Sequence, residues 1–177
     1  NKMGQSALSN LDVEKALSEV VEAIPALINA EGISILLLDE SNDELVFRAA
    51  SGALSNHLRD VRMPAETGVA GMVLQSGKPA LVDDEGQEHI YRDIDNSLGY
   101  ETRSLLAAPI KRGGEVIGVI EAVHSSPNAF RMKNKDVLET ASAWVAIALE
   151  NARQHRAIER RLQESQALAS ISQALNK

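Results

Sequence analysis

The sequence predicts an α+β fold, with helices packed on a central antiparallel β-sheet of five or six strands. Two hairpin patterns and two helical patterns support this prediction. The hairpin patterns are ISILLLDESNDELVFRAASG and SLLAAPIKRGGEVIGVIEAVH, each with two β-rich runs joined by a polar or glycine-containing turn. The helical patterns lie near the two ends of the 177-residue chain, where apolar residues recur every three or four positions.

The amino-terminal helix is predicted over residues 9–29, after a flank at residues 1–10. Ser9 and, three positions later, Asp12 resemble a capping box at its start. Pro25 is expected to kink this helix without ending it. Its apolar face consists of Val13, Leu17, Val20, Val21, Ile24, Leu27 and Ile28.

The middle of the chain supplies the sheet and its connections. Strands are predicted at 33–39, 44–51, 61–63, 79–82, 104–111 and 115–124, with short helices at 55–60 and 68–76. Residues 83–103 are polar and show no pattern of their own. Because loops of this length are usually functional or mobile, we expect this segment to be a lid.

The carboxy-terminal helix is predicted from Met132 to the end of the chain. A helix over 132–175 would span roughly 65 Å, whereas a globule of this size is only about 35–40 Å across. Residues 154–177 should therefore project as a signalling or coiled-coil helix. The predicted seam of a parallel homodimer consists of Trp144, Val145, Ala148, Ala152, His155, Ile158 and Leu162.

Composition removes several function classes. A net charge of −7 and a pI near 5.1 give no basic surface for nucleic acid. The absence of cysteine excludes disulfides, thiolate catalysis and thiolate metal sites. Without a long apolar run or a signal peptide, we expect a cytoplasmic segment that makes no membrane contact and precedes an output domain of a longer protein.

The order of these motifs resembles a GAF domain over about residues 11–153. The resemblance rests on TGVAGMVLQSGKPALVDD, RSLLAAPIKRGGEVIGVIEAVH, NAF and DVLETASAWVAIALENAR, after an initial helix and hairpin. It implies a GAF/PAS-like fold, with the terminal helices on one sheet face and short helices with a lid over a pocket on the other. It also implies a regulatory module of bacterial signal transduction, for example in two-component systems.

The known activities of this family fit the residues poorly. The Asn-Lys, Phe and Asp-Glu pattern of its cyclic-nucleotide-binding members is replaced by His124-Ser125, Phe130 and Asn134-Lys135. Few aromatic residues are present to stack on a purine. Without cysteine, bilin attachment and methionine sulfoxide reduction are excluded. No histidine or carboxylate spacing predicts haem or a metal, so we expect no cofactor and no enzymatic activity.

Glu121 is the most unusual residue of the predicted sheet. Strand alternation places it with Ile117, Val119 and Val123, on the face opposite Val116, Gly118, Ile120 and Ala122. A carboxylate there needs either a polar pocket or a partner, for which Arg103 is the candidate. Both alternatives remain open.

The glycines of GVAGMVLQSGKP are explained mostly by packing. Gly71 is expected to let the helix approach the sheet, and Gly77 to end it, whereas Gly68 could leave amide donors free toward a ligand. The candidate pocket residues are Ser51, Gly68, Val69, Met72, Asp83, Asp93, Arg103, Val119 and Glu121.

The sequence therefore predicts a non-enzymatic sensory domain. It would bind a small molecule and relay occupancy through a dimeric carboxy-terminal helix to an output domain. The alternative is a structural dimerisation module without a ligand, whose pocket is filled by Met63, Met72, Leu74 and Ile120.

Overall fold

A single antiparallel sheet of six strands organises the computed structural model, which describes residues 2–52 and 55–177. The strand order is β3-β2-β1-β6-β5-β4, so the predicted α+β class is confirmed. The two predicted hairpins form its centre, because β1 pairs with both β2 and β6. The strands are β1 Gly32–Asp39, β2 Glu44–Ala50, β3 Arg62–Pro64, β4 Ala80–Val82, β5 Ser104–Arg112 and β6 Glu115–His124.

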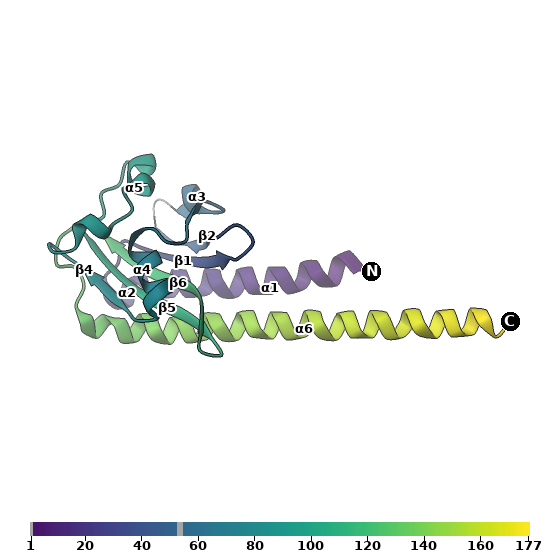
Figure 1. Cartoon of the computed structure of the whole chain (residues 1–177). Helices are drawn as coiled ribbons and strands as arrows, with labels where there is room; N and C mark the ends of the chain where they lie inside the picture. The colour runs from purple at the N-terminus through teal and green to yellow at the C-terminus, as the bar shows by residue number, and fades with distance from the viewer. Residues whose placement is uncertain (1, 53–54) are drawn as a thin grey trace.

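The helices form two groups on opposite faces of this sheet. The terminal helices cover one face, and the short helices with the segment 83–103 lie over the other (Figure 1). The terminal group is α1 Lys2–Ala23, α2 Pro25–Ile28 and α6 Lys135–Leu175, the last preceded by the 3₁₀ turn η2 Met132–Asn134. The other group is α3 Ser55–Leu58, α4 Gly68–Ser76, η1 Gln87–His89 and α5 Arg92–Leu98.

The amino-terminal helix differs from its prediction at both ends. It begins at Lys2, so Ser9 does not cap it and the described part of the 1–10 flank is already helical; residue 1 lies outside the described residues. Pro25 also ends α1 instead of only kinking it. Proline has no amide hydrogen to donate, and the chain re-forms a short helix α2 that ends at Asn29 with a positive φ of 54°.

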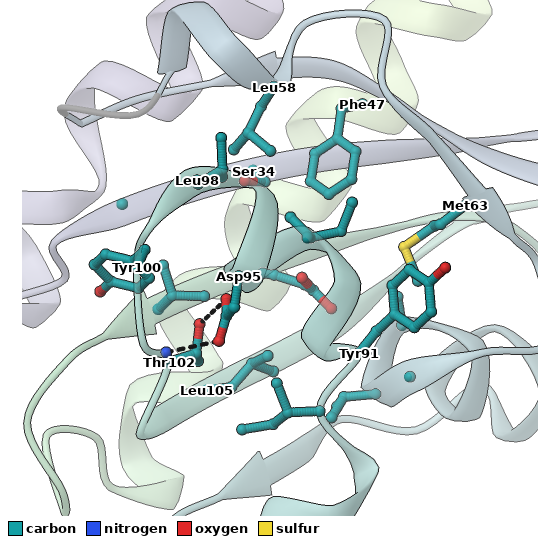
Figure 2. Close-up of a pocket in the computed structure, with 18 of the residues that line it drawn as sticks. Ser34, Phe47, Leu58, Met63, Tyr91, Asp95, Leu98, Tyr100, Thr102 and Leu105 are labelled. Carbon is teal, nitrogen blue, oxygen red and sulfur yellow. Dashed lines mark hydrogen bonds between the residues drawn. The ribbon is translucent and has the colours of Figure 1, made fainter.

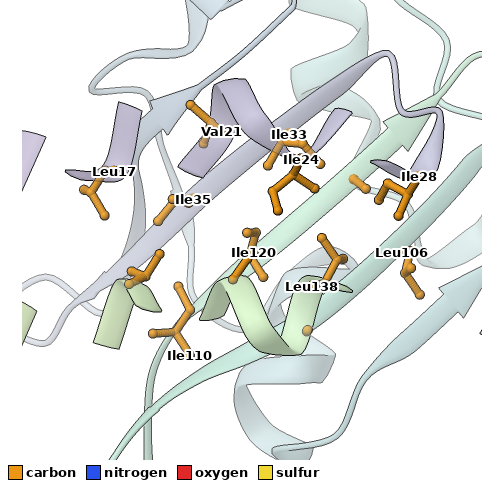
Figure 3. Packing of buried hydrophobic residues seen from close by; sticks show 14 of the residues in the cluster. Leu17, Val21, Ile24, Ile28, Ile33, Ile35, Leu106, Ile110, Ile120 and Leu138 are labelled. Atoms are coloured by element: carbon orange, nitrogen blue, oxygen red, sulfur yellow. The ribbon is translucent and has the colours of Figure 1, made fainter. Parts of the chain in front are cut away.

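The main core lies between the sheet and the terminal helices (Figure 3). Successive side chains of a strand point to opposite faces, so Ile33 and Ile35 of β1 and Ile120 of β6 enter this core together. Leu17 and Leu138 close it from α1 and α6, and both are fully buried. Leu27, predicted on the same helical face, is instead 67% exposed.

A β-bulge changes the predicted alternation at one end of β6. The register of β5 and β6 shifts between Ile110 and Lys111, and a bulge reverses the face that the following residues point to. Ile117, predicted on the same face as Glu121, therefore packs against the helix-side core. Beyond the bulge, Val119, Glu121 and Val123 keep the predicted face.

The helix α6 extends beyond the globule, as the sequence predicts. Its 41 residues correspond to roughly 60 Å, and its carboxy-terminal part extends past the sheet and past the start of α1 (Figure 1). The apolar side chains of this part are exposed: Ile158, Leu162, Leu168, Ile171 and Leu175. Within the described residues, no helix has the length and hydropathy to cross a membrane.

Two glycines of α4 have structural roles. Gly77 caps the helix with a φ of 67°, as expected. Gly71 permits a close approach, but to a different neighbour than predicted. A Cβ there would lie 2.9 Å from the carbonyl oxygen of Ala65 and 2.6 Å from the carbonyl carbon of Glu66, in the turn before the helix.

We expect Gly71→Ala to destabilise the protein although glycine to alanine normally favours a helix by about 1 kcal/mol. The added methyl would overlap backbone atoms that cannot rotate away, so a loss of roughly 2 kcal/mol or more is expected. Urea unfolding measures it. Gln75→Ala, on the exposed side of α4, is the control and should change stability by less than about 0.5 kcal/mol. A stabilising Gly71→Ala would contradict this account.

Candidate functional site

A cavity of about 240 Å³ lies between the sheet and the short helices. Its floor comes from β1, β2, β5 and β6, and its roof from α4, α5 and the segments around them (Figure 2). This volume is several times that of a water molecule, about 30 Å³, and lies below the usual lower limit of about 300 Å³ for ligand pockets. The cavity therefore suits a small organic molecule.

Strand pairing explains why this part of the sheet leaves space. Glu121 of β6 lies between Ser34 of β1 and Ala107 of β5. Both neighbours have small side chains, so neither fills the volume above the sheet. Because Ile33 and Ile35 point into the helix-side core, the intervening Ser34 must point to the cavity.

Ser34 and Glu121 bring polar groups without protein partners to this floor. Ser34 is only 7% exposed, and its hydroxyl makes no hydrogen bond to any residue in the described part of the chain. The carboxylate of Glu121 likewise has no hydrogen bond or ion pair there, and the predicted partner Arg103 is exposed to solvent instead. Glu121 is therefore a pocket residue and not half of an ion pair.

The environment of Glu121 favours its neutral form. Burial among protein atoms, with a smaller contribution from the nearby negative charge of Asp95, raises the pKa of Glu121 from 4.5 to about 7. The side chain keeps partial accessibility only because it faces the cavity. A group that titrates near neutral pH and faces a cavity is typical of binding and catalytic sites.

The roof of the cavity is held by Asp95 of α5 (Figure 2). Thr102 donates to it twice, from its amide and its hydroxyl, at 2.8 Å each. Arg92 donates to the same carboxylate at 2.9 Å and to the side-chain carbonyl of Gln87 at 2.8 Å. The segment 83–103 is therefore an ordered roof with two short helices, and not the irregular lid predicted from its polarity.

A second connection joins the roof to the start of β1. The hydroxyl of Tyr100 donates to Glu31 at 3.0 Å. The amide of Ser125 donates to the same carboxylate oxygen, and Nδ1 of His124 lies 3.3 Å from it. Hydrogen bonding from Ser125 holds the pKa of Glu31 below its usual value. Glu31, unlike Glu121, is fully partnered.

The structure brings four of the nine predicted pocket residues to this cavity: Ser51, Gly68, Val69 and Glu121. The other five lie outside it. Val119 is fully buried in the core beside the cavity, and Met72 is 43% exposed on the outer side of α4. Asp83, Asp93 and Arg103 lie on the roof segment but do not line the cavity.

Gly68 lines the cavity at the start of α4, with a φ of 68°. A Cβ at this position would lie 2.9 Å from Cβ of Tyr91 on the roof. The glycine therefore allows the roof to approach the helix closely. This packing role was not expected from the sequence, which suggested a ligand role only.

Most of the few aromatic residues of the chain line the cavity. Phe47, Tyr91 and Tyr100 line it, three of the five aromatic residues of the chain. They come from two segments that are distant in sequence, β2 and the roof segment 83–103, so no local pattern could have indicated this grouping. Phe130, the one match to the cyclic-nucleotide pattern, lies instead in the helix-side core.

The cavity is not self-filled in the way the alternative hypothesis requires. Of the four residues expected to fill it, only Met63 lines it. Ile120 points to the opposite face, Met72 is exposed, and Leu74 packs beside the core of α4. Among residues 2–52 and 55–177, no three histidine, aspartate or glutamate side chains are grouped so that they could hold a metal ion.

A second apolar feature is a groove between α1 and α6. Three large side chains at or beside it are exposed: Leu27, Trp144 and Ile147, at 67%, 67% and 60%. Leu27 lies next to the break at Pro25, whereas Trp144 and Ile147 lie near the start of α6. Together they form an apolar face, which we call the α1/α6 face.

The predicted dimer seam separates into two kinds of residue. Trp144, Ile158 and Leu162 are exposed, and His155 is exposed and paired with Glu159 at 3.0 Å. Val145 is fully buried in the core of its own subunit, and Ala152 packs against that core. Val145 therefore cannot contact a partner, and Ala148, partly buried in the groove, lies between the two groups.

Residues 12–149 match the family model described as the GAF domain. The chain is 24% identical over 161 residues to a probable 3′,5′-cyclic phosphodiesterase of Caenorhabditis elegans, covering 85% of this chain and 22% of that protein. It is 26% identical over 175 residues to the dual 3′,5′-cyclic-AMP and -GMP phosphodiesterase 11A of Takifugu rubripes, covering 92% and 19%. The chain thus spans about a fifth of the length of these relatives.

A solved structure confirms the fold independently. The GAF domain of a phosphoenolpyruvate-protein phosphotransferase from Coxiella burnetii superposes with a TM-score of 0.73 at 22% identity. The alignment covers 89% of this chain and 97% of that domain. Similarity at this level of identity concerns the architecture of the sheet and its flanking helices.

Proposed function

Because the chain belongs to the GAF domain family, we propose that it is a non-enzymatic regulatory domain that binds a small molecule in the cavity. Occupancy would be relayed through a dimeric α6 to an output domain. The observation that carries this proposal is the pair of unpartnered polar groups, Ser34 and Glu121, at the floor of a partly open and mostly apolar cavity. Such groups need a polar partner, which either water or the polar end of a bound molecule provides.

The strands provide a physical connection between ligand and helix. Ser34 lies between Ile33 and Ile35, and Glu121 lies between Ile120 and Ala122. These four neighbours pack against the terminal helices on the opposite face of the sheet. A ligand that moves β1 or β6 would therefore change the packing of α6. A nearly complete switch needs a differential affinity of about 5.5 kcal/mol between the two states.

The α1/α6 face provides a surface for a second copy of the chain. Exposed apolar side chains continue from Trp144 and Ile147 to Ile158, Leu162 and the residues beyond them. A parallel partner would cover this surface, because the same helix of a second copy presents the same residues at the same heights. The predicted seam is thereby revised: Ile147 and Leu27 belong to it and Val145 does not.

The substrate named for the cyclic phosphodiesterases that this chain resembles is not assigned to this domain as its ligand. The chain corresponds to about a fifth of each of them, and the residues at the cyclic-nucleotide pattern differ here. His124 contacts Glu31 and Phe130 lies in the other core. We therefore propose a regulatory ligand other than a cyclic nucleotide, without nucleic acid or membrane as a direct partner.

Native mass spectrometry of the protein as purified tests the ligand proposal. We expect a defined excess mass that is released on stronger activation, and its loss in Ser34→Leu, whose larger side chain would occupy the cavity floor. Ser41→Leu, in the exposed turn after β1, is the control and should keep the excess mass. If the purified protein shows no excess mass, candidate small molecules are added and their binding is measured by the same method. A ligand that binds Ser34→Leu as well as the unchanged protein would contradict this site.

A further inference from the structure

The charge of the cavity lining restricts the chemistry of its ligand. Three carboxylates line the cavity, Glu31, Asp95 and Glu121, whereas no lysine, arginine or histidine occurs among the described lining residues. A phosphate or carboxylate ligand would be placed beside these negative charges with no positive group to bind it. Because Asp95 is already paired with Arg92 at 2.9 Å, the repulsion of an anion and the attraction of a cation would come mainly from Glu31 and Glu121.

Of the three carboxylates that line the cavity, only Glu121 remains available to a ligand. Asp95 already accepts hydrogen bonds from Thr102 and Arg92, and Glu31 from Tyr100 and Ser125. The unpartnered hydroxyl of Ser34 is directly opposite Glu121 in the strand register. The two together form a polar spot in an otherwise apolar floor.

The remaining lining favours an organic cation over a metal ion. Metal ions such as Ca²⁺ require several converging oxygen ligands, and no such group exists among the described residues. Phe47, Tyr91 and Tyr100 instead contribute aromatic surface. Aromatic faces attract organic ammonium groups, and their area buries the apolar part of such a molecule.

Resting on the proposed ligand function of this cavity, we propose that its ligand is a small organic amine bound in its protonated form. The ammonium group forms an ion pair with Glu121 and a hydrogen bond to the hydroxyl of Ser34. The apolar part of the amine lies against the aromatic side chains beneath the roof. The ligand thereby provides the positive charge that the lining itself lacks.

This binding mode makes affinity depend on pH. The titratable groups around the site are Asp95 of α5, Tyr91 and Tyr100 of the roof segment, and Glu31 before β1, with His124 behind Glu31. Glu121 has a pKa of about 7 in the empty cavity, so it is mostly neutral at pH 6 and mostly ionised at pH 8. Affinity for an ammonium ion should therefore rise about tenfold over this range.

Benzylamine, benzyl alcohol and benzoate test this inference as probes of equal shape and different charge. Their dissociation constants are measured by calorimetry or ligand-observed NMR at about pH 8. We expect benzylamine to bind at least tenfold more tightly than benzyl alcohol, and benzoate to bind most weakly. Glu121→Gln should remove the preference for the amine. Glu115→Gln, at an exposed carboxylate of the same strand, should keep it.

The outcomes separate this inference from the proposed function. Equal or tighter binding of benzyl alcohol or benzoate would overturn the amine inference while leaving a small-molecule site in place. A preference that persists in Glu121→Gln would overturn the role of Glu121. Absence of binding of all three probes at about 10 mM, equivalent to roughly 3 kcal/mol, would also overturn the amine inference. The mass-spectrometry experiment above then decides the proposed function separately.

Discussion

Glu121→Gln is expected to raise the free energy of unfolding by roughly 3 kcal/mol at about pH 8 in the ligand-free protein. The pKa of this carboxyl rises from 4.5 to about 7 on folding, and each unit corresponds to 1.36 kcal/mol. Above pH 7 the folded protein must hold an ionised carboxylate in a poorly solvated place. The glutamine amide has nearly the same shape and carries no charge.

The pH dependence of this effect has a definite sign. Between about pH 4.5 and pH 7 the folded state binds the Glu121 proton more than the unfolded state does, so the stability of the unchanged protein falls as pH rises through this window. The extra free energy of unfolding of Glu121→Gln should therefore grow as pH rises through this window, and it should be nearly absent below about pH 4.5. Urea unfolding at four or five pH values measures it.

Glu115→Gln is the matched control, because Glu115 is an exposed residue of β6. It should change stability little, with no difference between acid and alkaline pH. A destabilising Glu121→Gln, or a gain that does not depend on pH, would mean that Glu121 is ionised and well solvated in the folded protein. The cavity account of this residue would then fail.

Trp144→Glu is expected to weaken the proposed dimer at least a hundredfold. Trp144 is 67% exposed on the α1/α6 face next to Ile147, and buried tryptophans at interfaces commonly contribute 2 kcal/mol or more. A glutamate at this position would also place like charges near the two-fold axis of the dimer. Analytical ultracentrifugation across a concentration series measures the dissociation constant.

Met132→Glu provides the control for this prediction. Met132 is also an exposed apolar residue, at 46%, but it does not line the groove between α1 and α6. It should leave the dimer affinity nearly unchanged. The dissociation constant of a chain truncated after Arg153 gives the contribution of the projecting part of α6 to dimer affinity. A monomeric unchanged protein, or a Trp144→Glu variant that dimerises normally, would contradict the proposed face.

The sequence by itself determined the order of the helices and strands and the antiparallel pairing within the two hairpins. Alternation in ISILLLD and in EVIGVIEAVH specifies which side chains face which layer, except at Ile117, where the bulge reverses the face. Gly113 and Gly114 adopt the positive φ that their turn needs. The three- and four-residue spacing in α6 likewise predicted a helix longer than the globule. These are local properties, because the chain itself sets the period of each element.

Only the tertiary structure decided what surrounds the cavity. Phe47 of β2 meets Tyr91 and Tyr100 of the roof segment there. The partners of Asp95 and Glu31 determine that Glu121 is the one cavity carboxylate left free. The sequence marked Glu121 as unusual, but it left open whether Arg103 neutralises it. It also assigned Val145 to a partner, although the subunit's own core buries this residue. Periodicity specifies a direction from the helix axis, whereas only the packing of all the elements specifies what lies in that direction.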